Sequence, residues 1–295
     1  MPGGTALNYE LECWSRWLLE TRLRGPHGKD SLEFLSAIRD RVLDRAQLRL
    51  GDYALDVGSG DGLLAFGALH RVGPNGLVVV DDISQDLLNE CMGVAATAGV
   101  AGRMRFILNS ATDLRDVPDA SIDVVLIRSV LMYIQDKAAA VAECRRVLRP
   151  GGRVSVFEAI RPAGQAHRFG IDPGQIAHLA QRVEEAYHAA KLPETGSMLD
   201  VDERALYALF SHAGFAHLDL ELHVKSRRER KDPHWFDEML NGNAHPRHPC
   251  LREAMAQALT RREAEEYVSF YRSAVATTGV TTTHAFAYIS GSLEP

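Results

Sequence analysis

The feature that most constrains the fold is a glycine-rich turn between an apolar run and a helical pattern, ALDVGSGDGLL at residues 54–64. A short strand that runs into alternating glycines and then into a helix predicts the opening of a βα unit. Glycine adopts backbone conformations closed to other residues and lets a ligand approach the chain, so Gly58, Gly60 and Gly62 predict a ligand at this turn. An ordinary glycine-rich turn is the plainer alternative, because such a motif alone is weak evidence.

Similar βα units follow between residues 50 and 160. β-branched runs alternate with helical spacing, which predicts a parallel sheet in an α/β fold. Two later runs predict a sixth and a seventh strand. The expected strands are 53–57, 77–82, 104–108, 122–128, 153–158, 217–225 and 281–290, and the core helices are 62–72, 85–98 and 137–148, the last followed by a turn at 148–152.

Helical patterns also flank this core. About fifty residues separate the last two strands, too many for a hairpin loop, so we expect a cap there over the carboxyl edge of the sheet. The expected domains are an N-terminal helical cover (1–49), a cofactor-binding core (50–160) and the remainder of the sheet (161–295) with lid or cap inserts at 161–200 and 226–278. The flanking helices are expected at 7–23, 31–48, 174–191, 201–213, 251–259 and 261–275.

Composition excludes several classes of protein. The formal net charge of -6 argues against nucleic acid as a partner, and no apolar run approaches the roughly 18 residues of a membrane span. Cys13, Cys91, Cys144 and Cys250 form no CxxC pair, which argues against disulfides and zinc. Without a secretory signal at the start, these features predict a cytoplasmic protein. They indicate no oligomeric state.

The residues around the turn discriminate between two cofactor classes. A diphosphate-binding loop follows G-x-G-x-x-G, and counting from Gly58 its third glycine would fall at Leu63. Asp56 and Asp61 flank the turn and would repel a diphosphate, whereas the positively charged amino-acid end of S-adenosylmethionine would not be repelled. We therefore predict S-adenosylmethionine rather than NAD, with Asp56, Gly58, Ser59, Gly60 and Gly62 at the site.

The ends of the second and third strands supply further candidates. In VVVDDIS, Asp82 is the preferred acceptor for the ribose hydroxyls, Asp81 is the fallback, and Ile83 could lie against the adenine. Strand-end solvation and helix capping are the plainer interpretation of these aspartates, and Ser84 is expected to cap the next helix. After the third strand, Ser110 and Ala111 are candidates for the adenine edge, although serine in a loop is usually a turn residue.

Four segments resemble the signatures of class I S-adenosylmethionine-dependent methyltransferases, closest to the small-molecule branch that includes the quinone-biosynthesis C-methyltransferases. They are DVGSGDG at 56–62, DIS at 82–84, SIDVV at 121–125 and LRPGG at 148–152. The resemblance covers residues 50–160. It implies a doubly wound, mostly parallel seven-stranded sheet with an antiparallel last strand, S-adenosylmethionine over its carboxyl edge, the family's glycines at Gly58, Gly60 and Gly62, and its ribose carboxylate at Asp82.

Departures from related families narrow the activity. Many relatives carry aspartate where Ser110 stands, which weakens the adenine assignment. IRSVL at 127–131 differs from the Asn/Asp-Pro-Pro-Tyr/Phe segment of nucleobase amino-methyltransferases, so a DNA substrate is not expected. The cysteines of arsenite methyltransferases and the metal-binding Asp-Asp-Asn set of catechol-type enzymes are missing, so no metal is expected.

Methyl transfer is a displacement at a carbon that the sulfonium already activates. Aligning the acceptor contributes roughly 7–11 kcal/mol, and a general base adds roughly 10²–10⁴-fold in rate, so a base is optional. The candidate catalytic residues are Glu158 and His167 as proton acceptors and Tyr133 as a wall of the acceptor pocket. Arg128 is a candidate for the methionine portion of the cofactor. Structural alternatives are an ion pair for Arg128 or Glu158, a core position for Tyr133 and a surface position for His167.

The sequence thus predicts methyl transfer to a small-molecule acceptor through an O, N or C nucleophile. Two alternatives from other classes remain at this point. One is a non-methylating enzyme on the same fold, such as a cyclase in which the bound cofactor only shapes the pocket. The other is a non-catalytic cofactor-binding module, against which the intact glycines and Asp82 argue.

Overall fold

A computed structural model describes residues 28–160, 168–190, 202–242 and 249–295 of the chain. The chain divides into two compact units. Unit 1 comprises Met1–Ile160, Asp200–Leu222 and Phe286–Pro295, and unit 2 comprises Arg161–Leu199 and His223–Ala285. The predicted inserts 161–200 and 226–278 thus belong to one unit, and their role as a lid stays a prediction.

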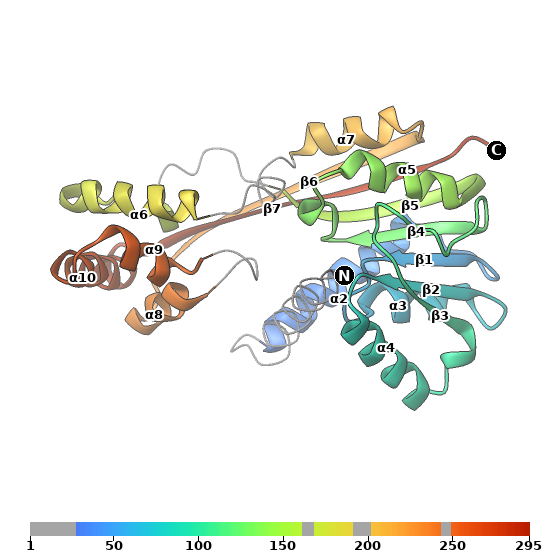
Figure 1. Ribbon diagram of the computed structural model, residues 1–295, viewed down its shortest axis with the longest axis horizontal. Helices are drawn as coiled ribbons and strands as arrows, with labels where there is room; N and C mark the ends of the chain where they lie inside the picture. Colours follow the sequence, from blue (N-terminus) through green and yellow to red (C-terminus); the bar gives the residue numbers. More distant parts are fainter. Residues whose placement is uncertain (1–27, 161–167, 191–201, 243–248) are drawn as a thin grey trace, which may run out of the picture. The chain divides into compact units, whose positions relative to one another are not determined.

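Unit 1 is built on a sheet in the order β3-β2-β1-β4-β5-β7-β6 (Figure 1). Parallel pairs join β3 to β2, β2 to β1, β1 to β4 and β4 to β5, and the last strands are antiparallel. The predicted fold class is confirmed. The strands are β1 (Tyr53–Val57), β2 (Leu77–Asp82), β3 (Met104–Leu108), β4 (Ile122–Arg128), β5 (Leu148–Ile160), β6 (Ala216–Glu229) and β7 (Val280–Ser292).

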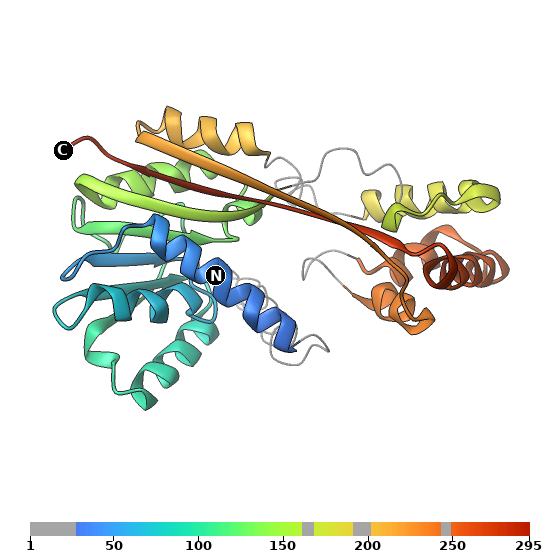
Figure 2. The same ribbon diagram turned by 180° about the vertical axis from the view of Figure 1, so that it is seen from behind.

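Helices complete unit 1. One apolar core joins α2, α3 and α4 to alternate strand residues such as Ala54, Val78 and Val124, and Figure 2 shows α2 lying across this face of the sheet. On the described residues, α5 packs against both β5 and α7. The bounds are α2 (Gly28–Arg45), α3 (Leu63–Val72), α4 (Gln85–Thr97), η1 (Ala101–Arg103), η2 (Leu131–Tyr133), α5 (Lys137–Val147) and α7 (Glu203–His212). The predicted helix at 7–23 lies outside the described residues.

The first four strands have the predicted bounds, residue for residue. β1, β2 and β4 are readable because both of their faces are largely buried, so each is a nearly continuous apolar run. β3 is an edge strand with exposed residues at Arg105 and Leu108. The predicted turn at residues 148–152 is wrong, since this segment opens β5. Gly151 has φ 72°. Its N–H donates to the Glu294 carbonyl at 3.0 Å, and the Leu293 N–H donates to the Gly152 carbonyl at 2.8 Å. Pairing with the distant C-terminal residues therefore turns a local helix-stop signal into strand.

Unit 2 is a helical unit with an aromatic core. Phe169 contacts the rings of Trp235, Phe236 and Tyr271 at centroid distances of 5.4, 6.0 and 6.2 Å. Its elements are η3 (Arg168–Gly170), η4 (Gly174–Ile176), α6 (Ala177–Ala189), α8 (Pro233–Asn241), α9 (Leu251–Ala258) and α10 (Arg261–Thr277), with parts of β6 and β7.

Helix α8 was not predicted from the sequence. Its start carries two recognised signals, because the Asp232 side chain accepts a hydrogen bond from the His234 N–H as N-cap and proline occupies the first turn. Among the described residues, no helix is both long and apolar enough to cross a membrane.

Candidate functional site

Strand register brings three charged side chains to one face at the carboxyl edge of the sheet. Alternate residues of a strand share a face of the sheet. Asp56 therefore lies on the same face as Ala54, Asp82 on the same face as Val80, and Arg128 on the same face as Leu126. Ala54, Val80 and Leu126 all belong to the core under α2, α3 and α4. Asp56, Asp82 and Arg128 therefore end this face, and Asp81 lies on the opposite face.

The glycine turn between β1 and α3 requires glycine at each of the three predicted positions. Gly58, Gly60 and Gly62 have φ angles of 62°, 58° and 78°, in the left-handed region that side chains disfavour. A Cβ built on Gly58 would lie 2.6 Å from Cγ2 of Val130, and one on Gly62 would lie 2.7 Å from Cε2 of Phe66. The backbone of the turn forms a bend, and the side chain of Val130 packs against it at Gly58.

Asp82 connects this bend to the start of α4. Its carboxylate accepts hydrogen bonds from the Gly60 N–H at 2.8 Å and the Ser84 N–H at 2.9 Å. Ser84 in turn caps α4 by accepting from the Leu87 N–H, as predicted. Ile83, between them, is 45% exposed despite its apolar side chain. Asp82 thus orders the bend, and an exposed apolar surface stands beside it.

Buried carboxylates concentrate at this edge. Burial raises the pKa of Asp56 to about 7, although Arg128 and a hydrogen bond from the Ala65 N–H oppose the rise. Burial also raises the pKa of Asp82, against bonds from backbone N–H groups. Asp81 is 1% exposed, and burial together with repulsion from Asp82 and Asp56 raises its pKa well above its usual value. The carboxylates at this edge therefore favour a bound cation and disfavour a diphosphate.

Asp81 and Ser59 differ from Asp82 in their hydrogen bonds. The Asn109 N–H lowers the pKa of Asp81, but no hydrogen bond of normal geometry reaches either carboxylate oxygen in the described structure. The Oγ of Ser59 is likewise buried without a partner among the described residues. An orphaned hydroxyl within the bend is a polar group that a ligand can satisfy.

The loop after β3 places the two adenine candidates differently. Ser110 shares a hydrogen bond with the Thr112 hydroxyl at 2.8 Å and accepts from the Thr112 N–H at 3.3 Å, as in a side-chain turn. Ala111 is 8% exposed. Ser110 therefore has the local turn role that was the plainer alternative, and the adenine contact stays a prediction for both residues.

Beyond the bend, Arg128, Tyr133 and Glu158 lie near one another. Burial lowers the pKa of Arg128, while nearby Asp56, Tyr133 and Glu158 oppose this change. Burial raises the pKa of Tyr133 to about 12, with Glu158 adding to the rise. Tyr133 is thus a neutral phenol at pH 7, and as a proton acceptor it would be weak.

Glu158 has a local structural role that sequence reasoning missed. Its carboxylate is fully buried and accepts the N–H groups of Val130, Leu131 and Met132 at 2.9, 2.8 and 3.4 Å. These bonds engage both oxygens, so its role as a catalytic base stays a prediction. No local sequence signal pairs a strand-end glutamate with a turn 26 to 28 residues earlier. His167 lies outside the described residues.

The residues at this edge fit S-adenosylmethionine. The buried carboxylates favour a sulfonium and an ammonium group, and the Ser59 hydroxyl in the bend lacks a partner among the described residues. No cluster of three metal-ligating side chains occurs in the part of the chain that the structure describes.

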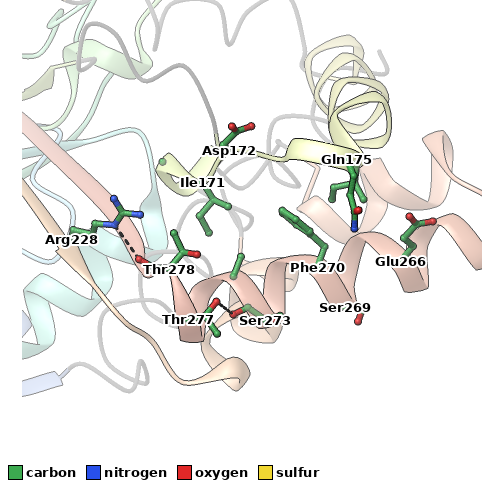
Figure 3. Close-up of a pocket in the computed structure, with 13 residues that line it drawn as sticks. Ile171, Asp172, Gln175, Arg228, Glu266, Ser269, Phe270, Ser273, Thr277 and Thr278 are labelled. Atoms are coloured by element: carbon green, nitrogen blue, oxygen red, sulfur yellow. Dashed lines mark hydrogen bonds between the residues drawn. The ribbon is translucent and has the colours of Figure 1, made fainter.

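Unit 2 contains a separate hollow of about 820 Å³ (Figure 3). Residues from the η3–η4 segment, such as Gln175, face residues of α10 such as Phe270. Its walls are mixed in character, with Arg228, Asp172 and Glu266 among them. Its lining residues do not include Asp56, Asp82 or Arg128.

Comparisons with known proteins identify similar chains. The model of the "Methyltransferase domain" family matches residues 55–156. Nocamycin O-methyltransferase of Saccharothrix syringae is 28% identical over 290 residues, covering 93% of this chain and 97% of that protein. The ubiquinone/menaquinone biosynthesis C-methyltransferase UbiE of Saccharophagus degradans is 30% identical over 182 residues, covering 59% of this chain and 71% of that protein.

Among solved structures, phosphoethanolamine N-methyltransferase 2 of Haemonchus contortus in complex with S-adenosyl-L-methionine has a TM-score of 0.53 at 16% identity. The match covers 94% of this chain and 59% of that chain. At this identity the similarity concerns the fold.

Proposed function

Because the chain belongs to the class I S-adenosylmethionine-dependent methyltransferases, we propose that it transfers the methyl group of S-adenosylmethionine to a small-molecule acceptor. The observation that carries this proposal is the left-handed glycine bend of residues 58–62 beside three buried carboxylates. This combination suits an adenosyl sulfonium and disfavours a diphosphate. The cyclase-like and non-catalytic alternatives have no observation of their own in their favour.

Named residues would hold the cofactor. Asp82 would accept the ribose hydroxyls with its remaining lone pairs, since Oδ2 accepts the Gly60 N–H and Oδ1 accepts the Ser84 N–H. Exposed Ile83 would cover the adenine. The Ser59 hydroxyl and the backbone of the bend would meet the methionine end, where Asp56 and Arg128 provide opposite charges.

The bound cofactor supplies an activated methyl group. The protein then has to orient the acceptor and exclude water, which alone contributes roughly 7–11 kcal/mol. The two strand-end carboxyl groups with a pKa near 7, Asp56 and Glu158, are both buried and hydrogen-bonded. The proposed chemistry therefore rests on alignment of the acceptor with the methyl group. An acceptor that carries a proton on its nucleophile would lose it to water or to a weak base, or would bind already ionised.

We favour an oxygen nucleophile on the acceptor. The O-methyltransferase of Saccharothrix syringae matches almost the whole chain, including unit 2, whereas UbiE of Saccharophagus degradans matches 59% of it. Acceptor recognition in this fold is carried by the segments outside the shared core. A relative that matches those segments is the better guide to the acceptor.

The state of the described cysteines bears on the compartment, which stays a prediction. Cys91, Cys144 and Cys250 are all free thiols, and burial raises the pKa of Cys91 and Cys144 to about 12. Neutral buried thiols resist oxidation. We propose the cytoplasm as the site of action.

The test is methyl transfer from methyl-labelled S-adenosylmethionine to panels of phenols, enols, amines and carbon nucleophiles. We expect label in an oxygen-linked methyl group and stoichiometric S-adenosylhomocysteine. Calorimetry with S-adenosylmethionine and NAD separately tests the site. Binding of NAD without binding of S-adenosylmethionine would contradict the proposal.

A further inference from the structure

The carboxylate of Glu158 is the meeting point of three consecutive backbone donors. Oε1 accepts from Val130 and Leu131 at 2.9 and 2.8 Å, and Oε2 accepts from Met132 at 3.4 Å. An ionised carboxylate has only acceptor sites, so it matches three N–H groups. A protonated carboxyl would turn one oxygen into a donor that faces a donor.

The turn held in this way is one that the chain would not adopt alone. Ser129, the first residue after β4, has φ 54°, in the left-handed region that residues with a Cβ disfavour. Such a conformation persists where the surroundings fix it. The Ser129 N–H donates to the Phe157 carbonyl at 2.8 Å, and the bonds to Glu158 begin at the very next residue.

The same turn forms one wall of the glycine bend. Val130 packs so closely on Gly58 that a Cβ built there would lie 2.6 Å from one Val130 methyl and 3.0 Å from the other. A shift of the turn would therefore change the space at the bend. Arg128, two residues before Val130, ends the strand that leads into the turn.

We propose that Glu158 is a positioning residue for cofactor binding, which holds the N–H groups of residues 130–132 and thereby fixes Val130 against the bend at Gly58. The proposal rests on the proposed function, because it assumes that the bend receives S-adenosylmethionine. Glu158 need not touch the cofactor or the acceptor. Its effect passes through the turn.

The proposal has a consequence for pH. Burial raises the pKa of Glu158 to about 7, while its three backbone hydrogen bonds and Arg128 oppose the rise. Since the anchored turn requires the ionised form, the cofactor-bound protein favours ionisation. The affinity for S-adenosylmethionine is then at its maximum above pH 7 and falls as the pH drops through 7.

Other titratable groups near Glu158 have to be separated from it. Among the described residues these are Arg128 from β4 and Tyr133 from η2. Beyond Arg128 lies Asp56 on β1, whose pKa burial also raises to about 7. A pH profile of the wild type alone therefore does not distinguish Asp56 from Glu158, and variants of both are needed.

The experiment measures the Kd of S-adenosylmethionine by calorimetry between pH 6 and 8.5. We expect the wild-type Kd to rise about tenfold for the pH unit below the pKa. Glu158→Gln should raise the Kd about tenfold at pH 8, as for loss of one charge-assisted hydrogen bond, and should flatten the profile. Asp56→Asn should keep the rise below pH 7.

Asp123→Asn is the matched control. Asp123 also accepts a backbone N–H, from Tyr53 at 2.8 Å, but at the start of β1 and β4, the opposite end of the strands. Its Kd should equal the wild-type value at each pH. Thermal melts report folding of every variant, and a merely structural Glu158 would lower the melting temperature without setting the pH profile.

Val130→Ala tests the proposal independently of Glu158. It keeps the anchored backbone and removes the contact with Gly58, so the Kd should rise while its pH dependence remains. An unchanged Kd for this variant overturns the proposal. So does a pH profile that Asp56→Asn flattens and Glu158→Gln does not. Failure of the wild type to bind S-adenosylmethionine at any pH would instead remove the proposed function.

Discussion

Replacing Gly58 with alanine tests the geometry of the bend most directly. At φ 62° an L residue costs about 1–2 kcal/mol in backbone energy. The new Cβ would also lie 2.6 Å from Val130 Cγ2 and 3.0 Å from Cγ1, an overpacking that typically costs about 1–3 kcal/mol. Together, Gly58→Ala should lower the free energy of unfolding by about 2–5 kcal/mol.

A double-mutant cycle with Val130→Ala separates the two contributions. Truncating Val130 makes room for the new methyl group but leaves the backbone strain. Urea unfolding of the wild type, both single variants and the double variant should therefore give a favourable coupling of about 1–3 kcal/mol between the two substitutions. A residual cost of about 1–2 kcal/mol should remain from φ.

The matched control is Gly93→Ala. Gly93 lies within α4, and a Cβ built there meets nothing within 4 Å, so alanine should stabilise the protein by about 0.4–1 kcal/mol. Strict additivity of Gly58→Ala and Val130→Ala would refute the reasoning. The bend would then not be packed against Val130.

Three further predictions concern other residues. Asp82→Asn should raise the Kd of S-adenosylmethionine by roughly 10- to 100-fold, from about 1.5–3 kcal/mol for a charge-assisted hydrogen bond, and unchanged affinity in calorimetry would move the ribose contact elsewhere. Because burial raises the pKa of Asp81, the stability that its protonated form confers is lost as pH rises through that pKa. Asp81→Asn should therefore stabilise the protein by about 1–3 kcal/mol at pH 8 and by less at pH 5. In urea unfolding, a difference in unfolding free energy between variant and wild type that shrinks with rising pH would contradict this. Phe169→Ala removes three ring contacts and should destabilise unit 2 by about 1–3 kcal/mol. Limited proteolysis should then cut faster within residues 168–190 and 223–285, at an unchanged rate for unit 1.

Local patterns were sufficient where burial is complete. β1, β2 and β4 follow from nearly continuous apolar runs, and the helix cap at Ser84 follows from its position before a helical pattern. The start of β5 could not be read in this way. The Pro-Gly-Gly segment is a local helix-stop signal, and it becomes strand because it pairs with Leu293 and Glu294.

In the candidate site, too, some features could be predicted from local sequence and others could not. Sequence spacing favoured Asp82 over Asp81, and the structure adds a reason, since alternation puts Asp82 on the face of Asp56 while Asp81 points to the other face. By contrast, sequence reasoning offered Glu158 a role as a proton acceptor or in a structural ion pair, and neither is the backbone anchor that the structure contains. Its three donors come from a neighbouring strand's turn, and that proximity depends on the pairing of β4 with β5.

The sequence by itself determined the βα order, the glycine bend and the class of cofactor, because these depend on residue types within a few positions of one another. Only the tertiary structure decided which carboxylates are buried, which of them are hydrogen-bonded, and that Val130 and Glu158 act on the bend. Those properties arise from strand register and from packing between distant segments, 28 residues apart for Val130 and Glu158 and 72 apart for Gly58 and Val130, which no local pattern encodes.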